Sequence, residues 1–519
     1  MRQQSSKEKP DLKRGQITVF AALMFLVIMG MVFCVLEGIR SYLTGGLFED
    51  AAYGAGNRVR ACYDIALFDR YHLFFLDPRE LDLISDDVRD YVDHYCSGDS
   101  FFGWTCGSVS LSDRISPLDL NGEPVRSEIR EWMKYKKESR ECESADKSLR
   151  KLVRAVSKDM KKAAGVNKRL DSLSSGKSSR LSGKDEEEEA EESEEEILWK
   201  EIRETFDMLS GSDLLTVCGA SQKGVSTLSF RPFLLPSAGK GRGLGKGKGN
   251  DRIPKPDVMK GNTFSGLLIR EPCWNARSPL LSRDADLKDY IHENFACFTT
   301  WEGREQKESA LRYEREYLVC GEASDRGNLK SAVSRIFMLR FMTNYINAEK
   351  NGKINARAEK IARKAAGKEG LPDSVKDAKT VLIAVLSYGE TIVDMRKLLK
   401  GGRVKGDKRE GSFYLTFDSY AERIRSGNTG KAAGDTSYED YLDLILTSEK
   451  LKDLYLYRMM DLMQLNVKLD EPGFLMSRSL YSFSCTTTAA SARWYPAIPG
   501  FGIRFGMKQK LSCRKTITY

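Results

Sequence analysis

The residue types that most often carry chemistry are scarce and scattered in this sequence. Its three histidines are His72, His94 and His292, and none has the spacing of a zinc motif such as H-E-x-x-H. No G-x-S-x-G sequence marks a nucleophilic serine. Carboxylates are abundant, but they lie in charged helical stretches where they indicate no particular reaction. We therefore predict no catalytic residue, no metal site and no cofactor, and we expect that the protein is not an enzyme.

A glycine- and lysine-rich segment at 238–260 is the one stretch that suggests phosphate binding. A phosphate-binding loop of the form G-x-x-x-x-G-K-[ST] would need glycine at position 240 or 242, where Lys240 and Arg242 stand. The segment is therefore predicted to be a flexible basic loop. The net charge of +9 is divided into separate acidic and basic blocks. Because no basic stripe is interleaved with aromatic residues, we expect no nucleic-acid partner.

The chain has eleven cysteines, of which Cys34 lies in an apolar N-terminal run and ten lie beyond it. An even number of cysteines permits disulfides. The two pairs that the sequence favours are Cys96 with Cys106, across a glycine- and aromatic-rich loop, and Cys485 with Cys513, between two strand-like segments. The alternative is that these cysteines are buried free thiols.

The apolar run lies in KRGQITVFAALMFLVIMGMVFCVLEGIR, which spans residues 13–40. Ile17–Leu36 carries no charge, and about 20 apolar residues are enough to cross a bilayer as a helix. Basic residues precede the run and balanced charges follow it, so the N-terminus is expected in the cytoplasm and the rest of the chain outside. A cleaved signal peptide has an apolar region of about 7–15 residues and a small-x-small cleavage site. This run is longer and lacks that site, so we predict a retained single-pass anchor in the cell membrane.

Beyond the anchor, apolar residues recur three or four positions apart in runs at 329–346, 375–399 and 438–467, as on one buried face of a helix. The last fifty residues alternate apolar with polar residues and predict a strand, a loop and a returning strand. Segments 225–230 and 416–420 are weaker strand candidates. The predicted fold class is α+β, mainly α, with an N-terminal transmembrane helix and stalk, a helical extracytoplasmic head and a small C-terminal antiparallel β element.

Composition shifts along the chain predict its division. The expected parts are a cytoplasmic basic leader (1–15), a transmembrane helix (16–36), a helical stalk (37–77), a small mixed region (78–135), a charged low-complexity insertion (136–198), a mixed segment of the head (199–237), the flexible glycine/lysine loop (238–260), the helical head (261–470) and a hairpin-like C-terminal segment (471–519).

The start of the chain resembles a known signal. KRGQITVFAALMF is similar to a class III prepilin-type signal, in which basic residues and a glycine directly precede the apolar helix, and it is most similar to the TadE/TadG-like minor pilins of tight-adherence (Flp-type) pili. Leu36-Glu37-Gly38-Ile39-Arg40 matches the L-E-x-x-R that ends the apolar span in the related form of low-GC Gram-positive bacteria. The stretches YDIALFDRYHLFFLD (63–77), YLVCGEASDRGNLKSAV (317–333) and TSYEDYLDLIL…LYRMMDLMQLNV (436–467) resemble an uncharacterised family of such surface proteins.

The resemblance implies cleavage between Gly15 and Gln16, which leaves the apolar helix in place. The pilin pattern has glutamate at the fifth mature position, where this chain has Phe20. The expected function is that of a single-pass, membrane-anchored extracytoplasmic structural or assembly protein, associated with a pilus. Its expected partners are membrane lipid, through residues 17–36, and other pilin-like or pilus-assembly proteins, through the stalk helix. The alternative is a membrane-anchored ectodomain that binds a ligand or acts on cell-wall material.

Overall fold

A computed structural model provides the fold, and it divides the chain into two compact units. The structure describes residues 11–76, 81–95, 102–137, 162, 193–231, 234–238, 285–303, 308–368, 370–408, 412–430, 434–447, 454–492 and 508–519. Unit 1 comprises Met1–Asp119 with Ser477–Tyr519, and unit 2 comprises Leu120–Met476. The predicted fold class is confirmed, because the described residues are mainly helical, with an N-terminal apolar helix and a small antiparallel sheet.

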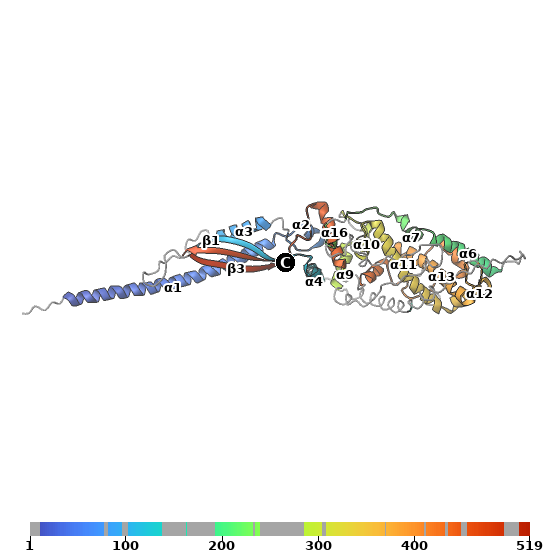
Figure 1. The fold of residues 1–519 in the computed structure, drawn as a ribbon, viewed down its shortest axis with the longest axis horizontal. Coiled ribbons are helices and arrows are strands. Elements are labelled where there is room, and N and C mark those ends of the chain that lie inside the picture. Colours follow the sequence, from blue (N-terminus) through green and yellow to red (C-terminus); the bar gives the residue numbers. More distant parts are fainter. Residues whose placement is uncertain are drawn as a thin grey trace, which may run out of the picture. The chain divides into compact units, whose positions relative to one another are not determined.

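Unit 1 combines a long helix with the C-terminal strands. Its elements are α1 (Asp11–Arg60), α2 (Ile65–Tyr71), α3 (Leu81–His94), β1 (Trp104–Ile115), β2 (Ser482–Ala492) and β3 (Lys508–Thr518). The strands form one antiparallel sheet in the order β1-β2-β3, which lies alongside α1 and α3 (Figure 1). Apolar residues from the helices and the inner face of the sheet form the core of this unit, among them Phe48, Val88 and Phe483. The C-terminal strands are therefore part of the same unit as the N-terminal helix, rather than an appendix to the head.

The strand β1 lies in the small mixed region (78–135), for which the sequence predicted no strand, and its first residues fall in the predicted glycine- and aromatic-rich loop. It pairs with β2 from Trp104↔Ser491 to Ile115↔Ser482, with register irregularities after Cys106 and after Ser112. Ser108 to Ser112 alternate polar with apolar residues, but Trp104 and Cys106 are out of phase with Val109 and Leu111, because a register irregularity lies between them. Because the hydrophobic alternation that identifies a half-buried strand is weak here, only pairing with the distant residues of β2 reveals the strand.

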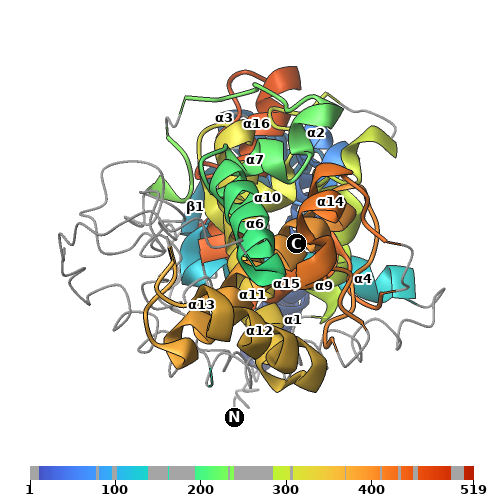
Figure 2. The same cartoon turned by 90° about the vertical axis from the view of Figure 1, so that its right-hand side faces the viewer.

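Unit 2 is helical. Its helices are η2 (Asp119–Gly122, shared with the boundary), α4 (Glu123–Lys137), α6 (Glu194–Ser210), α7 (Leu214–Val217), η3 (Ala220–Lys223), α9 (Ala285–Asn294), η6 (Trp301–Gly303), α10 (Glu314–Cys320), α11 (Asp325–Lys350), α12 (Gly352–Ala365), α13 (Val375–Leu399), η7 (Phe417–Ser419), α14 (Tyr420–Arg425), α15 (Tyr438–Leu446) and α16 (Leu454–Asp470). The long helices α11 and α13 pack against each other, and α12 packs against α13 and α6 (Figure 2). Their apolar faces are those that the three- and four-residue spacing predicts, including buried Leu329, Ile336 and Leu382.

Three sequence expectations differ from the structure of unit 2. The helical run at 438–467 forms two helices, α15 and α16, on either side of residues outside the described set. The strand candidate at 225–230 makes only an isolated bridge between Ser229 and Ser324, and the candidate at 416–420 is the helical turn η7 leading into α14. In both stretches, side chains pack against neighbouring helices, and tertiary contacts override the local strand preference.

The acidic run at 185–196 was predicted to lie in a solvated insertion, yet its end forms the first turn of α6. Glu195 is buried and pairs with Lys360, at 2.6 Å, and with Arg357, at 3.4 Å. Acidic residues in a first helical turn also interact favourably with the helix dipole. Part of the run is therefore a packed helix start.

Gly389 shows how closely α13 approaches α14. A Cβ atom at Gly389 would lie 2.4 Å from Tyr420 Cε2 and 2.8 Å from its hydroxyl oxygen, and the Tyr420 side chain is fully buried. We expect Gly389→Ala to lower the free energy of unfolding by about 2 kcal/mol, since overpacking of about 1–3 kcal/mol outweighs the helix propensity of alanine. Chemical denaturation of the full chain in detergent measures the change. Gly303→Ala, where no atom lies within 4 Å of the added Cβ, is the matched control, and a stabilised Gly389→Ala protein would contradict the packing.

Candidate functional site

The helix α1 has two different surfaces along its length. Between residues 17 and 36 its large apolar side chains are exposed, and α1 is long and apolar enough to cross a membrane. After this segment one face becomes buried. The buried positions include Arg40, Thr44, Phe48, Ala51, Ala55 and Val59. Their spacing of three or four residues keeps them on one side of the helix, and this side packs against the sheet and α3.

A polar clamp ties the start of the packed half to the C-terminal strands. Arg40 is only 1% exposed; its Nε and Nη2 atoms donate to the carboxylate of Glu37 at 3.1 and 2.8 Å, and Nη2 also donates to the carbonyl oxygen of Ala492 at 2.7 Å. At the next residue of α1, the carbonyl oxygen of Ser41 accepts a hydrogen bond from Gln509 Nε2 at 3.2 Å. The two-fold contact of a guanidinium with a carboxylate fixes geometry as well as charge. The L-E-x-x-R sequence therefore connects the apolar helix to the ends of β2 and β3.

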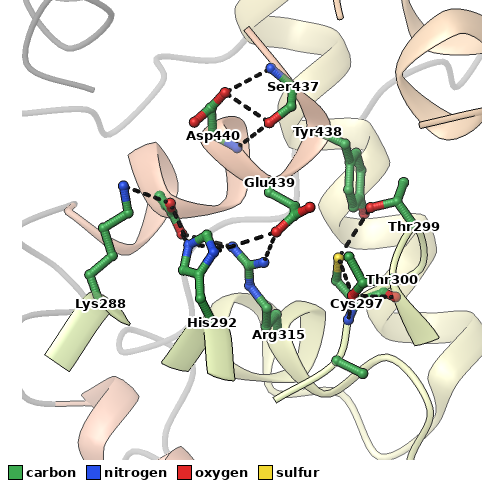
Figure 3. A network of polar contacts seen from close by, with 12 residues as sticks. Lys288, His292, Cys297, Thr299, Thr300, Arg315, Ser437, Tyr438, Glu439 and Asp440 are labelled. Atoms are coloured by element: carbon green, nitrogen blue, oxygen red, sulfur yellow. Dashed lines mark hydrogen bonds and ion pairs between the residues drawn. The ribbon is translucent and has the colours of Figure 1, made fainter. Parts of the chain in front are cut away.

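In unit 2 a cluster of charged side chains converges between α9, α10 and α15 (Figure 3). Arg315 of α10 is 1% exposed and donates to Glu439 Oε2 at 2.6 Å and to Asp443 Oδ1 at 2.8 Å. His292 of α9 lies 2.8 Å from Asp443 Oδ2, and Lys288 lies 3.3 Å from the same oxygen. The helices α9 and α15 each present a pair of side chains four residues apart, which places both members of a pair on one face, and α10 contributes Arg315 alone. We call these five residues the Arg315 cluster.

Local sequence explains why α15 begins where it does. Ser437 Oγ accepts a hydrogen bond from the backbone nitrogen of Asp440, and the Asp440 carboxylate accepts one from the backbone nitrogen of Ser437. This reciprocal capping box satisfies two backbone donors that a helix start leaves unpaired. It places Glu439 in the first turn and Asp443 one turn later, both toward Arg315.

The electrostatics of the Arg315 cluster favour charged side chains. Burial opposes ionisation of Asp443, but Arg315, His292 and Lys288 together hold its pKa well below the usual range. The hydrogen bond from His292 and the charge of Arg315 outweigh partial burial and lower the pKa of Glu439 to about 2. Burial alone would lower the pKa of His292, yet its contacts with Asp443 and Glu439 raise it. The His292 ring has a carboxylate beside each nitrogen: Asp443 lies 2.8 Å from Nε2, and Glu439 lies 3.4 Å from Nδ1. His292 is therefore part of a structural ion-pair network.

The residue after Arg315, Glu316, is a buried carboxylate whose charge has fewer stabilising partners than that of Asp443. Glu316 is fully buried, and its Oε1 atom accepts hydrogen bonds from the backbone nitrogen of Phe298 and from the Tyr438 hydroxyl, both at 2.9 Å. Among the residues that the structure describes, none donates a hydrogen bond to its Oε2 atom. Burial therefore raises the pKa of Glu316 to about 7, in spite of these hydrogen bonds and the nearby Arg315.

A second buried cluster joins α11 and α13 to the segment that follows α13. Arg340 donates to Asp394 Oδ2 at 2.6 Å, and Lys408 contacts the carboxylates of both Asp394 and Glu390. Asn344 donates to Asp394 Oδ2 at 3.0 Å. Burial opposes ionisation of Asp394, but the two cations lower its pKa to about 2. The charges of the two cations and the two carboxylates therefore balance in the interior, where all four residues are at most 6% exposed.

These clusters have the composition of structural ion-pair networks. Every carboxylate in them contacts at least one cation or two hydrogen-bond donors. Within the described ranges, no group of three or more histidine, cysteine, aspartate or glutamate side chains could hold a metal ion. Partners in each cluster come from segments 14 to 151 residues apart, so the only sequence signal was the occurrence of charged residues on otherwise apolar helix faces.

The structure brings together some of the predicted site residues. Gly15 and Gln16 lie within α1, in a part whose side chains are outside the described set. Cys485 and Cys513 lie on adjacent strands, but both are free thiols and no bond joins them. Cys485 is opposite Lys515, and Cys513 is opposite Thr487. The two cysteines are thus diagonal neighbours, for which Cα atoms are typically about 7–8 Å apart, beyond the range of most disulfides.

The other predicted disulfide concerns Cys96, which lies outside the described residues. Its expected partner, Cys106, is a free and buried thiol on β1. Burial, with the nearby carboxylate of Asp93, raises the pKa of Cys106. A raised pKa means a smaller fraction of reactive thiolate.

Comparisons with known proteins give one match. The model of a family described as a family of unknown function (DUF5702) matches residues 186–491. The matched range contains both buried clusters, the helices α6 to α16 and most of β2. No curated protein and no solved structure matches the chain.

Proposed function

The chain belongs to the DUF5702 family, whose model covers more than half of it, and on this premise we propose that it is a single-pass, membrane-anchored extracytoplasmic structural protein of a pilus-like assembly. Residues 17–36 are the anchor, the residues before them are in the cytoplasm, and the residues after them lie outside the cell. The protein contributes shape and contacts to the assembly, and it turns over no substrate.

The observation that carries the proposal is the continuity of α1. One helix of 50 residues includes both the exposed apolar segment and the stripe packed under the sheet, without an intervening linker. A plain tether needs no rigid connection between its anchor and its folded domain. A continuous helix, in contrast, transmits the orientation of the membrane segment to the fold that it enters. Such coupling suits a subunit whose anchor and head must be placed together.

The polar clamp supports the same role. Arg40 is buried at the point where the apolar segment ends, and it contacts Glu37 on its own helix and Ala492 on β2. The clamp therefore holds the end of the sheet next to the outer end of the expected membrane span. Removal of its guanidinium would leave the Glu37 carboxylate and a strand carbonyl without this partner.

The surface of α1 beyond the apolar segment supports contacts with other subunits. Ile39, Tyr42 and Leu43 are between 45% and 83% exposed, although they lie outside the expected span. Apart from the adjoining stretch of α1 itself, no atom of the described residues lies within 4 Å of a Cβ atom built at Gly45 or Gly46. Small residues allow helices to approach closely in a membrane or along a helical bundle. In the proposed assembly this face packs against α1 of neighbouring pilin-like proteins.

The proposal predicts a retained anchor with a processed start. We expect the protein to remain in the membrane fraction after alkaline washing, since the exposed apolar segment needs a lipid environment. We expect its first residue to be Gln16, as read by mass spectrometry of the N-terminal peptide. A membrane-impermeant maleimide should label Lys350→Cys on intact cells, above the background of the native cysteines. The matched control is Lys7→Cys in a Gly15→Val variant, which retains the leader on the other side of the membrane, and this cysteine should be labelled only after lysis.

Different results would contradict different parts of the proposal. A mature start at Met1 would contradict prepilin-type processing but leave the anchor in place. A start beyond Glu37 would contradict the retained anchor. Labelling of Lys7→Cys but not of Lys350→Cys on intact cells would reverse the orientation of the protein.

A further inference from the structure

Lys408 places its amine among acidic side chains in the interior of unit 2. The amine contacts Glu390 Oε1 and lies 2.8 Å from Asp394 Oδ1. Glu390 is fully buried and Lys408 is 6% exposed, whereas lysine is almost never buried without partners. Glu390 and Asp394 lie on successive turns of α13, so both face the same amine. The ring of Phe413, with its centroid 5.5 Å from the amine, lines the site on another side.

The two carboxylates differ in their other partners. Asp394 Oδ2 accepts hydrogen bonds from Arg340, at 2.6 and 3.2 Å, and from Asn344, at 3.0 Å. Its charge is therefore matched by a guanidinium that stays protonated. Glu390, in contrast, is paired with Lys408, whose primary amine can act as a nucleophile.

The carboxyl group of Glu390 is held by the backbone of the segment after Lys408. Its Oε1 atom accepts a hydrogen bond from the Tyr414 nitrogen at 3.0 Å, and its Oε2 atom accepts one from the Leu415 nitrogen at 2.8 Å. Backbone donors in this position polarise the carboxyl carbon. They also stabilise the negative oxygen that develops when a nucleophile adds to that carbon.

From these contacts we propose that Lys408 and Glu390 condense to form an intramolecular amide cross-link. The Lys408 nitrogen adds to the Glu390 Cδ atom, and the bond from Cδ to one carboxyl oxygen breaks. The ammonium and the carboxylate together lose one molecule of water: two of the three ammonium protons leave with that oxygen, and the third remains on the amide nitrogen. No oxidation or reduction is involved.

The arrangement of the site supplies what this reaction needs. The amine touches a carboxyl oxygen, which places it near the roughly 3–3.5 Å from the carbon at which reacting atoms are held in near-attack geometries. Asp394 Oδ1 orients the amine, accepts a proton from the nitrogen after addition and returns it to the departing oxygen, in the manner of a general acid–base catalyst. Asp394 is a positioning and proton-transfer group here, and it keeps its own charge partner throughout.

The cross-link would have a mechanical consequence. It would covalently tie the segment after α13, including residues 403–408, to the middle of α13. A covalent tie limits how far the chain can extend when it is pulled or unfolded, as any cross-link that closes a loop does. Extracellular structural proteins under tension benefit from such a constraint.

Mass spectrometry of the purified full-length protein tests the proposal. We expect the intact mass to be lower by one water molecule than the mass calculated from the mature sequence. Trypsin should fail to cleave after Lys408, and the digest should contain a branched peptide that joins Lys408 to Glu390 of α13. The internal control is the ion pair of Lys360 with Glu195, at 2.6 Å, where Lys360 is 65% exposed and the two residues should occur in separate peptides.

Two variants identify the reacting groups. Lys408→Arg keeps the positive charge but removes the primary amine, and it should restore the full mass. Glu390→Gln should lose ammonia in place of water, because the leaving group is then an amine. A wild-type protein with its full mass and separate Lys408 and Glu390 peptides would overturn the proposal. A branched peptide in which the bond lies on Asp394 would overturn the assignment of Glu390.

Discussion

Replacement of Arg315 by methionine is expected to destabilise unit 2 by about 3–5 kcal/mol, because it leaves buried charges without their partner. Asp443 is 3% exposed and accepts a hydrogen bond from Arg315 at 2.8 Å, and Glu439 accepts another at 2.6 Å. Methionine fills most of the volume of the arginine stem but supplies no charge. His292 and Lys288 remain near Asp443, so the loss should be smaller than for an isolated buried carboxylate. Denaturant unfolding of the full chain in detergent measures the change.

The matched control is Arg363→Met. Arg363 also pairs with a carboxylate, that of Glu359 at 2.7 Å, but its side chain is 70% exposed. Exposed ion pairs contribute about 0–1 kcal/mol, so this variant should unfold close to the wild type. A further variant that replaces Arg315, Glu439 and Asp443 together by apolar residues should recover much of the stability. A loss below about 1 kcal/mol in Arg315→Met would show that the cluster does not hold α10 to α15.

Substitution of Glu316 by glutamine is expected to change how the stability of the protein depends on pH. Burial raises the pKa of Glu316 to about 7 in the folded protein, against a usual value of 4.5. The folded state therefore binds more protons than the unfolded state between these values, and its stability falls as the pH rises through this window. The difference between these two values corresponds to about 3 kcal/mol. Glutamine keeps an oxygen for Phe298 and Tyr438 but cannot ionise.

The relevant measurement is the difference in unfolding free energy between Glu316→Gln and the wild type. We expect this difference to move by about 3 kcal/mol in favour of the variant between about pH 4 and about pH 8. The comparison at two pH values removes any constant effect of the buried amide group. Glu359→Gln is the matched control, since Arg363 and Lys379 lower the pKa of Glu359 and its contribution has the opposite sign. A pH-independent difference would mean that Glu316 is not held in a desolvated site.

The helices could be predicted where one property repeats along the chain. In α13 the apolar residues recur every three or four positions from Val375 to Leu399, and the helix has these bounds. The uncharged run at 17–36 likewise predicted an apolar helix, which is the exposed part of α1. The sequence did not predict the strand β1 or the first turn of α6, because no single property repeats regularly along either of them. Register irregularities interrupt the alternation in β1, and acidic residues at the start of α6 resemble a solvated tract until Lys360 is placed beside Glu195.

The amino-acid sequence by itself determined that this protein has an apolar N-terminal helix, a helical main part and a short β element, because each depends on residues close together in the chain. Only the tertiary structure decided that β2 and β3 join α1 and β1 in one unit, through pairs such as Leu111↔Cys485. It also decided which charges meet inside unit 2. Arg315 finds Asp443 128 residues away, and Lys408 finds Glu390 across 18 residues. A buried charge depends on its partner and on the exclusion of water, and both arise only when distant segments pack.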